Sequence, residues 1–170
     1  AGTNLHFGVR EHAMGAIANG MALSNFRPFC STFLAFSDYL KPAIRMSCLM
    51  NLPVTYIFTH DSISIGEDGP THEPVEQLAS LRAIPNLNVF RPADMNELIG
   101  SWDFIINGCE PNALILSKQE FIPIATTDKN KVSKGAYIVR KETSRLNGII
   151  IATGSEVHKA LEIADSLYNE

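Results

Sequence analysis

Val54-Thr55-Tyr56-Ile57-Phe58 decides the fold class, because a run of β-branched and aromatic residues directly after Pro53 is typical of a buried strand. A polar, glycine-rich stretch over residues 60–72 follows it, and a helical pattern begins near Pro74. The same alternation between strand and helix extends along the chain in both directions. It predicts an α/β fold, with a three-layer parallel sheet that carries helices on both faces.

The apolar periodicity sets bounds for each expected element. Helices are expected over residues 11–23, 37–50, 74–82, 94–106 and 156–167. Strands are expected over residues 27–33, 54–58, 87–90, 113–116, 136–139 and 148–152. Ala13, Ala16 and Gly20 predict a stripe of small residues for close packing on the first helix. Asp94 and Glu97 have the spacing of a capping box.

The composition disfavours several classes of protein. The 170 residues are 45% hydrophobic with a net charge of −4, which argues against intrinsic disorder and against a dedicated nucleic-acid-binding protein. No apolar run approaches the ~18 residues of a membrane span, so no membrane partner is expected. Cys30, Cys48 and Cys109 are widely spaced, which disfavours a disulfide framework and fits a cytoplasmic location. The abrupt start and the final helical pattern suggest a segment of a larger protein.

Polar and aromatic residues follow the expected strands, at the carboxyl ends where open parallel sheets bind ligands. In chain order they are Arg10, Glu11, His12, Phe33, Phe36, Asp38, Tyr39, His60, Asp61, Glu67, Asp68, His72, Arg91, Ser117, Lys118 and Gln119. We expect them to gather on one rim of the sheet and to form a site. From position alone, structural roles stay open: a first-turn acid for Glu11, core packing for the aromatic residues, and a surface lysine at position 118.

Residues 60–72 combine two histidines with several carboxylates in one loop, and long ordered loops are often functional. The separation of His60 and His72 matches no usual zinc spacing. Hydrogen bonding to a polar substrate is therefore favoured over metal binding, and no metal ligand is assigned. Lys118 follows a strand end beside this loop, where it could pair with an anion such as phosphate.

Several stretches resemble motifs of the transketolase family, in order along nearly all of the chain. Residues 8–15 (GVREHAMG) and 32–39 (TFLAFSDY) are similar to its pyrimidine-binding domain, and residues 59–74 (THDSISIGEDGPTHEP) are the most specific match. The similarity continues through residues 81–94 and 116–119, and residues 151–156 (IATGSE) resemble the start of the family's C-terminal domain.

The resemblance implies a domain organisation, an activity and a cofactor. Residues 1–133 correspond to a pyrimidine-binding domain without its first strand, and residues 134–170 to a linker with the first strand and helix of the C-terminal domain. Transketolases use thiamine diphosphate to move a two-carbon ketol unit from a ketose phosphate to an aldose phosphate, in the pentose phosphate pathway. In the family the cofactor lies at the interface of a homodimer, and Mg²⁺ or Ca²⁺ with the diphosphate is held by an N-terminal domain that this chain lacks.

Three alternatives accompany this interpretation. Dihydroxyacetone synthase and deoxyxylulose-phosphate synthase use the same cofactor, and residues 59–62 with 66–72 favour transketolase over the second of these. The third alternative is a folded but non-catalytic fragment. We expect the full-length protein to be an active transferase and the isolated chain to be inactive, because the diphosphate-binding domain is missing from it.

Four residues match positions that surround the cofactor's pyrimidine ring. Glu11 resembles the catalytic carboxylate that hydrogen-bonds a nitrogen of this ring, and a partly buried carboxyl with a raised pKa is suited to share a proton there. Phe33, Phe36 and Tyr39 match the aromatic pocket, with Phe36 as the stacking ring.

Four residues match substrate-binding positions. His60 and Lys118 match contacts to the substrate phosphate, while Asp68 and His72 match positions near the substrate hydroxyls and the acceptor carbonyl, His72 with a catalytic role. The family usually has Arg in place of Lys118 and Asn in place of Glu120. Because lysine binds phosphate as a point charge and not as a bidentate fork, weaker binding of phosphorylated sugars is expected.

Overall fold

The computed structural model describes residues 4–120 and 122–168, so the outer ends of the two expected domains, residues 1 and 170, lie outside the described residues. The chain forms two compact units: the sheet unit, Ala1–Phe90 with Gly108–Lys118, and the α4–α5 unit, Arg91–Asn107 with Gln119–Glu170. The sheet unit contains α1 (Glu11–Leu23), β1 (Phe29–Phe33), η1 (Leu34–Phe36), α2 (Ser37–Leu49), β2 (Thr55–Thr59), η2 (Ile63–Asp68), α3 (Gln77–Arg82), β3 (Asn88–Phe90) and β4 (Asn112–Ile115). The α4–α5 unit contains α4 (Met95–Asn107), η3 (Lys129–Lys134) and α5 (Glu156–Tyr168).

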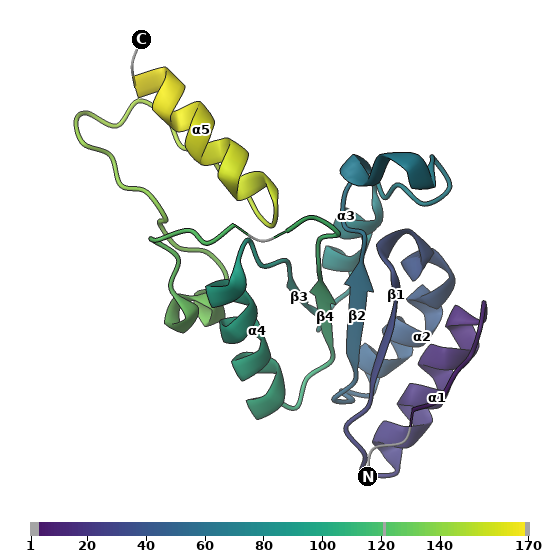
Figure 1. Ribbon diagram of the computed structural model, residues 1–170. Helices are drawn as coiled ribbons and strands as arrows, with labels where there is room; N and C mark the ends of the chain where they lie inside the picture. The colour runs from purple at the N-terminus through teal and green to yellow at the C-terminus, as the bar shows by residue number, and fades with distance from the viewer. Residues whose placement is uncertain (1–3, 121, 169–170) are drawn as a thin grey trace. The chain divides into compact units, whose positions relative to one another are not determined.

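A four-stranded parallel sheet in the order β1-β2-β4-β3 forms the centre of the sheet unit (Figure 1). The register places Tyr56 of β2 beside Cys30 of β1 and Ala113 of β4. Tyr56 and Phe58 are fully buried, which explains why this strand has the most apolar sequence in the chain. The prediction of an α/β fold with a parallel sheet flanked by helices is confirmed.

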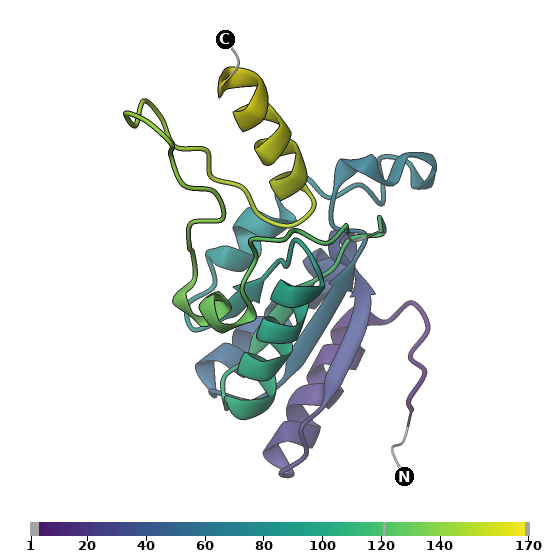
Figure 2. The ribbon, with the colours of Figure 1, turned by 60° about the vertical axis from the view of Figure 1, so that its left-hand side comes forward.

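Helices α1 and α2 lie side by side in both ribbon views (Figures 1 and 2), and together with β2 they enclose the core of the sheet unit. The predicted small-residue stripe on α1 is wrong, because Ala16 and Gly20 are exposed. The buried face of α1 consists of Met14, Gly15, Ala18, Asn19 and Ala22. An added Cβ on Gly15 would lie 2.7 Å from Leu40 Cδ1, so the close approach of α2 depends on this glycine instead.

The α4–α5 unit is organised around the buried carboxylate of Asp94. One oxygen accepts a hydrogen bond from the backbone of Glu97 (3.0 Å), and the other accepts from the backbone of Ile124 (3.1 Å) and the hydroxyl of Thr127 (2.6 Å). The Glu97 side chain returns to the backbone N–H of Ala93 (2.8 Å), one residue before the position that a capping box would use. The predicted cap therefore forms with its return bond shifted by one residue. Asp94 also holds the segment that carries Ile124 and Thr127.

The expected strands over residues 136–139 and 148–152 are not formed in the structure. A strand requires a neighbouring strand to satisfy its backbone groups, and neither segment has such a partner in the described part of the chain. Ile149 and Ile151 are 77% and 89% exposed, so their apolar pattern has no packing partner in this unit. The other predicted strands and helices form within a few residues of their expected bounds.

Candidate functional site

The carboxyl ends of three parallel strands bring most of the predicted site residues to one edge of the sheet. Phe33 ends β1 and is followed by η1 and the start of α2, which carry Phe36 and Tyr39. His60 directly follows β2, and Lys118 lies shortly after the end of β4. Because the strands are parallel and in register, these ends lie at the same edge. Arg91 and Gln119, which were expected on this rim, belong to the α4–α5 unit.

Aromatic rings and imidazoles form a connected cluster at this edge. The Phe33 ring stacks on the His60 ring with centroids 3.6 Å apart and an interplanar angle of 20°. His72 lies edge-on to Phe36 at 5.0 Å and to Phe33 at 6.0 Å. Phe36 also contacts Tyr39, whose side chain is 65% exposed, so the alternative that Tyr39 is a core residue is wrong.

His60 holds a backbone conformation that few side chains adopt. Its φ is +60°, in the left-handed region, where any residue other than glycine is disfavoured by contact between Cβ and the following carbonyl. The ring is held by the stack on Phe33 and by a contact of 2.9 Å between Nδ1 and the hydroxyl of Thr59. Unfavourable backbone geometry is often found at functional sites, where surrounding contacts hold it in place.

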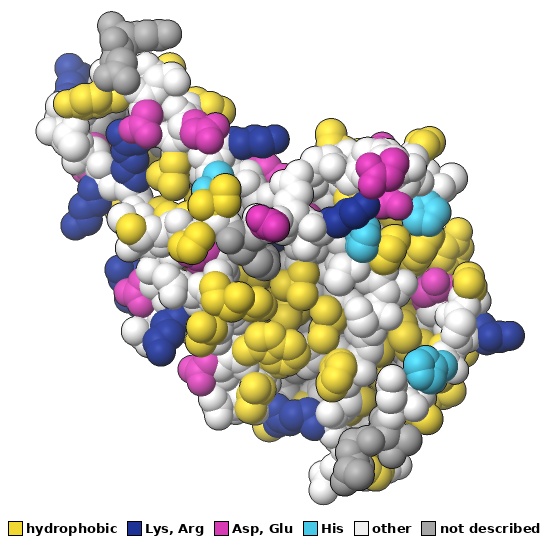
Figure 3. All heavy atoms as spheres, viewed as in Figure 1, with side chains coloured by type: hydrophobic (Ala, Val, Ile, Leu, Met, Phe, Trp, Pro, Cys, Tyr) yellow, Lys and Arg dark blue, Asp and Glu magenta, His cyan; other side chains and the backbone are white. Residues whose placement is uncertain are grey.

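Lys118 is paired with two carboxylates of the η2 loop, by which we mean residues 60–72 around η2. Its Nζ lies 3.1 Å from Oδ2 of Asp68 and 3.4 Å from Oε1 of Glu67. The hydrogen bond to Asp68, followed by that to Glu67, raises the pKa of the Lys118 ammonium, so the charged form is favoured. Figure 3 shows basic, acidic and histidine side chains gathered over this part of the sheet unit. The sequence did not predict this pairing, because 50 and 51 residues separate the partners.

Glu11 is the first residue of α1, and its side chain is partly buried. Within the described residues its carboxylate has no hydrogen bond or ion pair, including with the aromatic and histidine cluster. The chain enters the helix through a turn in which the Arg10 guanidinium donates to the carbonyl of Phe7 (2.8 Å) and Gly8 has a φ of +60°. The carboxylate is thus left available to a ligand at the start of the helix.

A buried glutamine that the sequence analysis missed connects two of the segments carrying site residues. Gln77, at the start of α3, donates from Nε2 to Asp38 Oδ2 (2.8 Å) and accepts from the backbone of Val75 (2.8 Å). Asp38 also pairs with Lys41 at 2.5 Å. Partial burial acts to raise the pKa of Asp38, but the hydrogen bonds from Lys41 and Gln77 outweigh it and lower that pKa. The spacing of 39 residues gives no local signal for this bond.

Two further features are absent from the described residues. None of the helices there is long and apolar enough to cross a bilayer. No group of three or more histidine, cysteine, aspartate or glutamate side chains within residues 4–120 and 122–168 is arranged to hold a metal ion.

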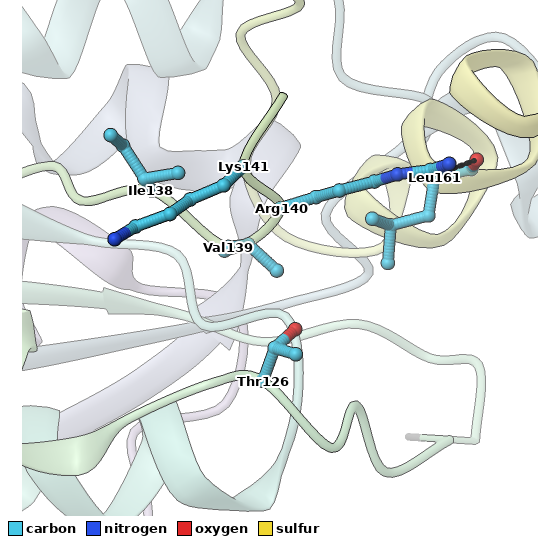
Figure 4. A pocket seen from close by; sticks show the side chains of 6 residues that line it. All are labelled: Thr126, Ile138, Val139, Arg140, Lys141 and Leu161. Atoms are coloured by element: carbon cyan, nitrogen blue, oxygen red, sulfur yellow. Dashed lines mark hydrogen bonds between the residues drawn. The ribbon is translucent and has the colours of Figure 1, made fainter. Parts of the chain in front are cut away.

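The α4–α5 unit has an open hollow of about 490 Å³ (Figure 4). It is lined by Thr126, Ile138, Val139, Arg140, Lys141 and Leu161. Arg140 extends toward α5, where it pairs with Asp165 at 2.5 Å and donates to the carbonyl of Leu161 at 3.4 Å. The hollow contains none of the predicted site residues, and its one arginine is already engaged.

Comparison with known proteins identifies the family. The model of the transketolase pyrimidine-binding domain matches residues 1–123. A probable transketolase of Streptococcus pneumoniae is 54% identical over 169 residues, which cover 98% of this chain and 26% of the relative. Transketolase from Leishmania mexicana superposes with a TM-score of 0.92 at 44% identity, over 96% of this chain and 24% of that one. A transketolase of Pichia stipitis in complex with sedoheptulose 7-phosphate gives a TM-score of 0.91 at 44% identity, over 95% of this chain and 24% of that one.

These matches confirm the resemblance inferred from the sequence motifs. They also set its extent, because the chain spans about a quarter of the length of the curated relatives it matches. The chain belongs to the transketolase family, of which it carries the pyrimidine-binding domain.

Proposed function

We propose that this chain forms the pyrimidine-binding wall of a transketolase active site, in a longer enzyme that transfers a two-carbon ketol unit from a ketose phosphate to an aldose phosphate. The observation that carries the proposal is the cluster of Phe33, Phe36, His60 and His72 at the strand ends, with Lys118 across the η2 loop. The family membership of the chain supports the reaction class.

The residues at this edge fit a thiamine diphosphate pyrimidine ring. Such a ring requires a polar partner for its nitrogen atoms and an apolar face on which to stack. The chain offers a partly buried carboxylate on Glu11 that has no partner among the described residues, and partly exposed aromatic faces on Phe36 and Tyr39. When bound, the cofactor supplies a stabilised carbanion, which no amino-acid side chain provides.

Glu11 would hold the cofactor's ring by a hydrogen bond and keep a proton at its carboxyl oxygen. Phe36 would stack against the ring, while Phe33 and Tyr39 would complete the apolar wall. These side chains orient the ring and polarise it, and they take no covalent part in the reaction.

Substrate recognition would fall to the residues of the η2 loop and the end of β4. His72 would donate a hydrogen bond to the acceptor carbonyl oxygen, because an imidazole ring N–H is a donor. Asp68 would accept hydrogen bonds from substrate hydroxyls, and His60 with Lys118 would face the phosphate. We further propose that the active unit is a cytoplasmic homodimer, with Mg²⁺ or Ca²⁺ held by a domain outside this chain.

The test is the exchange of the cofactor's thiazolium proton in the full-length protein, measured by quenched-flow NMR. Glu11→Gln is expected to slow exchange by at least about a hundredfold, because general acid–base groups typically contribute 10² or more. Glu110→Gln serves as a matched control at an exposed glutamate that precedes β4. Unchanged exchange in Glu11→Gln would exclude the role of this carboxylate.

A second candidate is that the isolated chain is a folded module without activity of its own. Its support is the coverage of about a quarter of each curated relative. Ketol transfer from xylulose 5-phosphate to ribose 5-phosphate should be absent with the 170 residues alone and present with the full-length protein. Turnover by the isolated chain would contradict this candidate.

A further inference from the structure

The Lys118 ammonium is already occupied by carboxylates of the same unit. A lysine ammonium has three donors and no planar fork, so it interacts with anions as a compact charge. One donor direction leads to Asp68 at 3.1 Å and another to Glu67 at 3.4 Å. An anionic ligand that approaches Lys118 therefore meets two negative charges at the same point.

The two carboxylates differ in how firmly they are held. The Asp68 side chain is 29% exposed, whereas the Glu67 side chain is 85% exposed and has no hydrogen bond or ion pair besides Lys118 within the described residues. The backbone on either side of the pair turns at Gly66 and Gly69, with φ values of +62° and +78°. Glu67 can thus leave Lys118 without losing packing, so its bond to Lys118 is the less firmly held of the two.

We infer that Glu67 is an internal competitor for Lys118, which weakens the binding of phosphorylated sugars and leaves unphosphorylated sugars unaffected. The inference rests on the proposed function and assigns a specificity role to Glu67, to which that function gives no role. A phosphate must either displace the Glu67 carboxylate or share the ammonium with it, and both cost binding free energy. A sugar without a phosphate has no need of Lys118, so the competition does not affect it.

Glu67→Gln tests the inference, because it removes one charge from an exposed side chain and keeps its size. In the full-length protein the KM for xylulose 5-phosphate is expected to fall about twofold to fivefold, the range typical of one exposed ion pair. The KM for L-erythrulose, an unphosphorylated ketose, should not change. Glu110→Gln is the control, because it makes the same charge change at the opposite end of β4. Equal changes for both ketoses, or no change for either, would overturn the inference.

A second measurement separates this inference from the proposed function. Inorganic phosphate is titrated into the 170-residue chain, and its affinity is read from NMR shifts of the Lys118 ammonium. Glu67→Gln should bind phosphate about twofold to fivefold more tightly than the parent chain and the Glu110→Gln control. An unaltered phosphate affinity would overturn the inference even if ketol transfer is observed, whereas absence of transfer with both ketoses would overturn the proposed function alone.

Discussion

Tyr56→Phe should destabilise the sheet unit, although it removes a single oxygen atom. Tyr56 lies fully buried in β2, and its hydroxyl is 3.0 Å from Asn19 Oδ1 on α1 and 3.0 Å from Ser47 Oγ on α2. The Asn19 amide donates in turn to the carbonyl of Ala43 (2.8 Å). These bonds connect a strand with both helices that pack against it, in a region that water does not reach.

The expected loss follows from the count of donors. The Tyr56 hydroxyl carries one proton, and Asn19 Oδ1 can only accept, so that proton is donated to Asn19, while Ser47 donates its own proton to the carbonyl of Ile44 at 2.7 Å. Within the described chain, no other donor reaches Asn19 Oδ1. Phenylalanine would leave this oxygen buried at a site that is 6% exposed. An unsatisfied buried acceptor costs about 1–3 kcal/mol, so we expect a decrease of that size in the free energy of unfolding.

Urea unfolding of the 170-residue chain, followed by circular dichroism, measures this decrease. The matched control is Tyr168→Phe, at a side chain that is 66% exposed, and it should change stability by less than about 0.5 kcal/mol. Asn19→Ala removes the acceptor, so in that background Tyr56→Phe should cost less. A loss below about 0.5 kcal/mol for Tyr56→Phe, or an equal loss in both backgrounds, would refute the argument.

Three further predictions test other parts of the structure. Burial raises the pKa of the Cys30 thiol to about 12. The contribution of this thiol to the free energy of unfolding is present in full below pH 9 and should be lost as the pH rises toward 12, by up to about 1.4 kcal/mol per pH unit. Unfolding titrations should show a shallower slope for Cys30→Ala than for the parent chain. Gly100→Ala should destabilise the α4–α5 unit, because its Cβ would overlap a backbone carbonyl of η3, whereas Gly20→Ala, with open space around it, should stabilise α1 by up to about 1 kcal/mol in thermal unfolding. Lys118→Arg should lower the KM for xylulose 5-phosphate, since guanidinium can bind phosphate as a fork; an unaltered KM would count against this contact.

The order of strands and helices could be predicted because each element carries its own period. The predicted bounds of α1 agree with the structure, and the predicted strand at residues 54–58 differs from β2 by one residue at each end. The packing face of α1 was not predictable in the same way, because small residues occur all around this helix. Asn19 points inward only because Tyr56 and Ala43 supply its partners, and those partners come from elsewhere in the chain.

The positions of the candidate site residues followed from one rule, that parallel strands present their carboxyl ends at the same edge. The rule located Phe33, His60 and Lys118, but it could not predict their contacts. The stack of His60 on Phe33 depends on a left-handed backbone at His60. Glycine would have indicated this conformation in the sequence, but the position carries a histidine. The roles assigned to these residues stay predictions until the experiments above are made.

Stability and specificity should be separable in this unit, because they depend on different chemical environments. The connection of Tyr56 to α1 and α2 is buried, so losing one polar partner leaves an oxygen that water cannot reach. The bonds of Lys118 to the η2 loop are exposed, so water replaces a lost carboxylate at little cost. Tyr56→Phe should therefore lower stability without altering the preference for phosphorylated ketoses, and Glu67→Gln should do the reverse. If both variants changed both properties, the strand ends and the core could not be treated as independent.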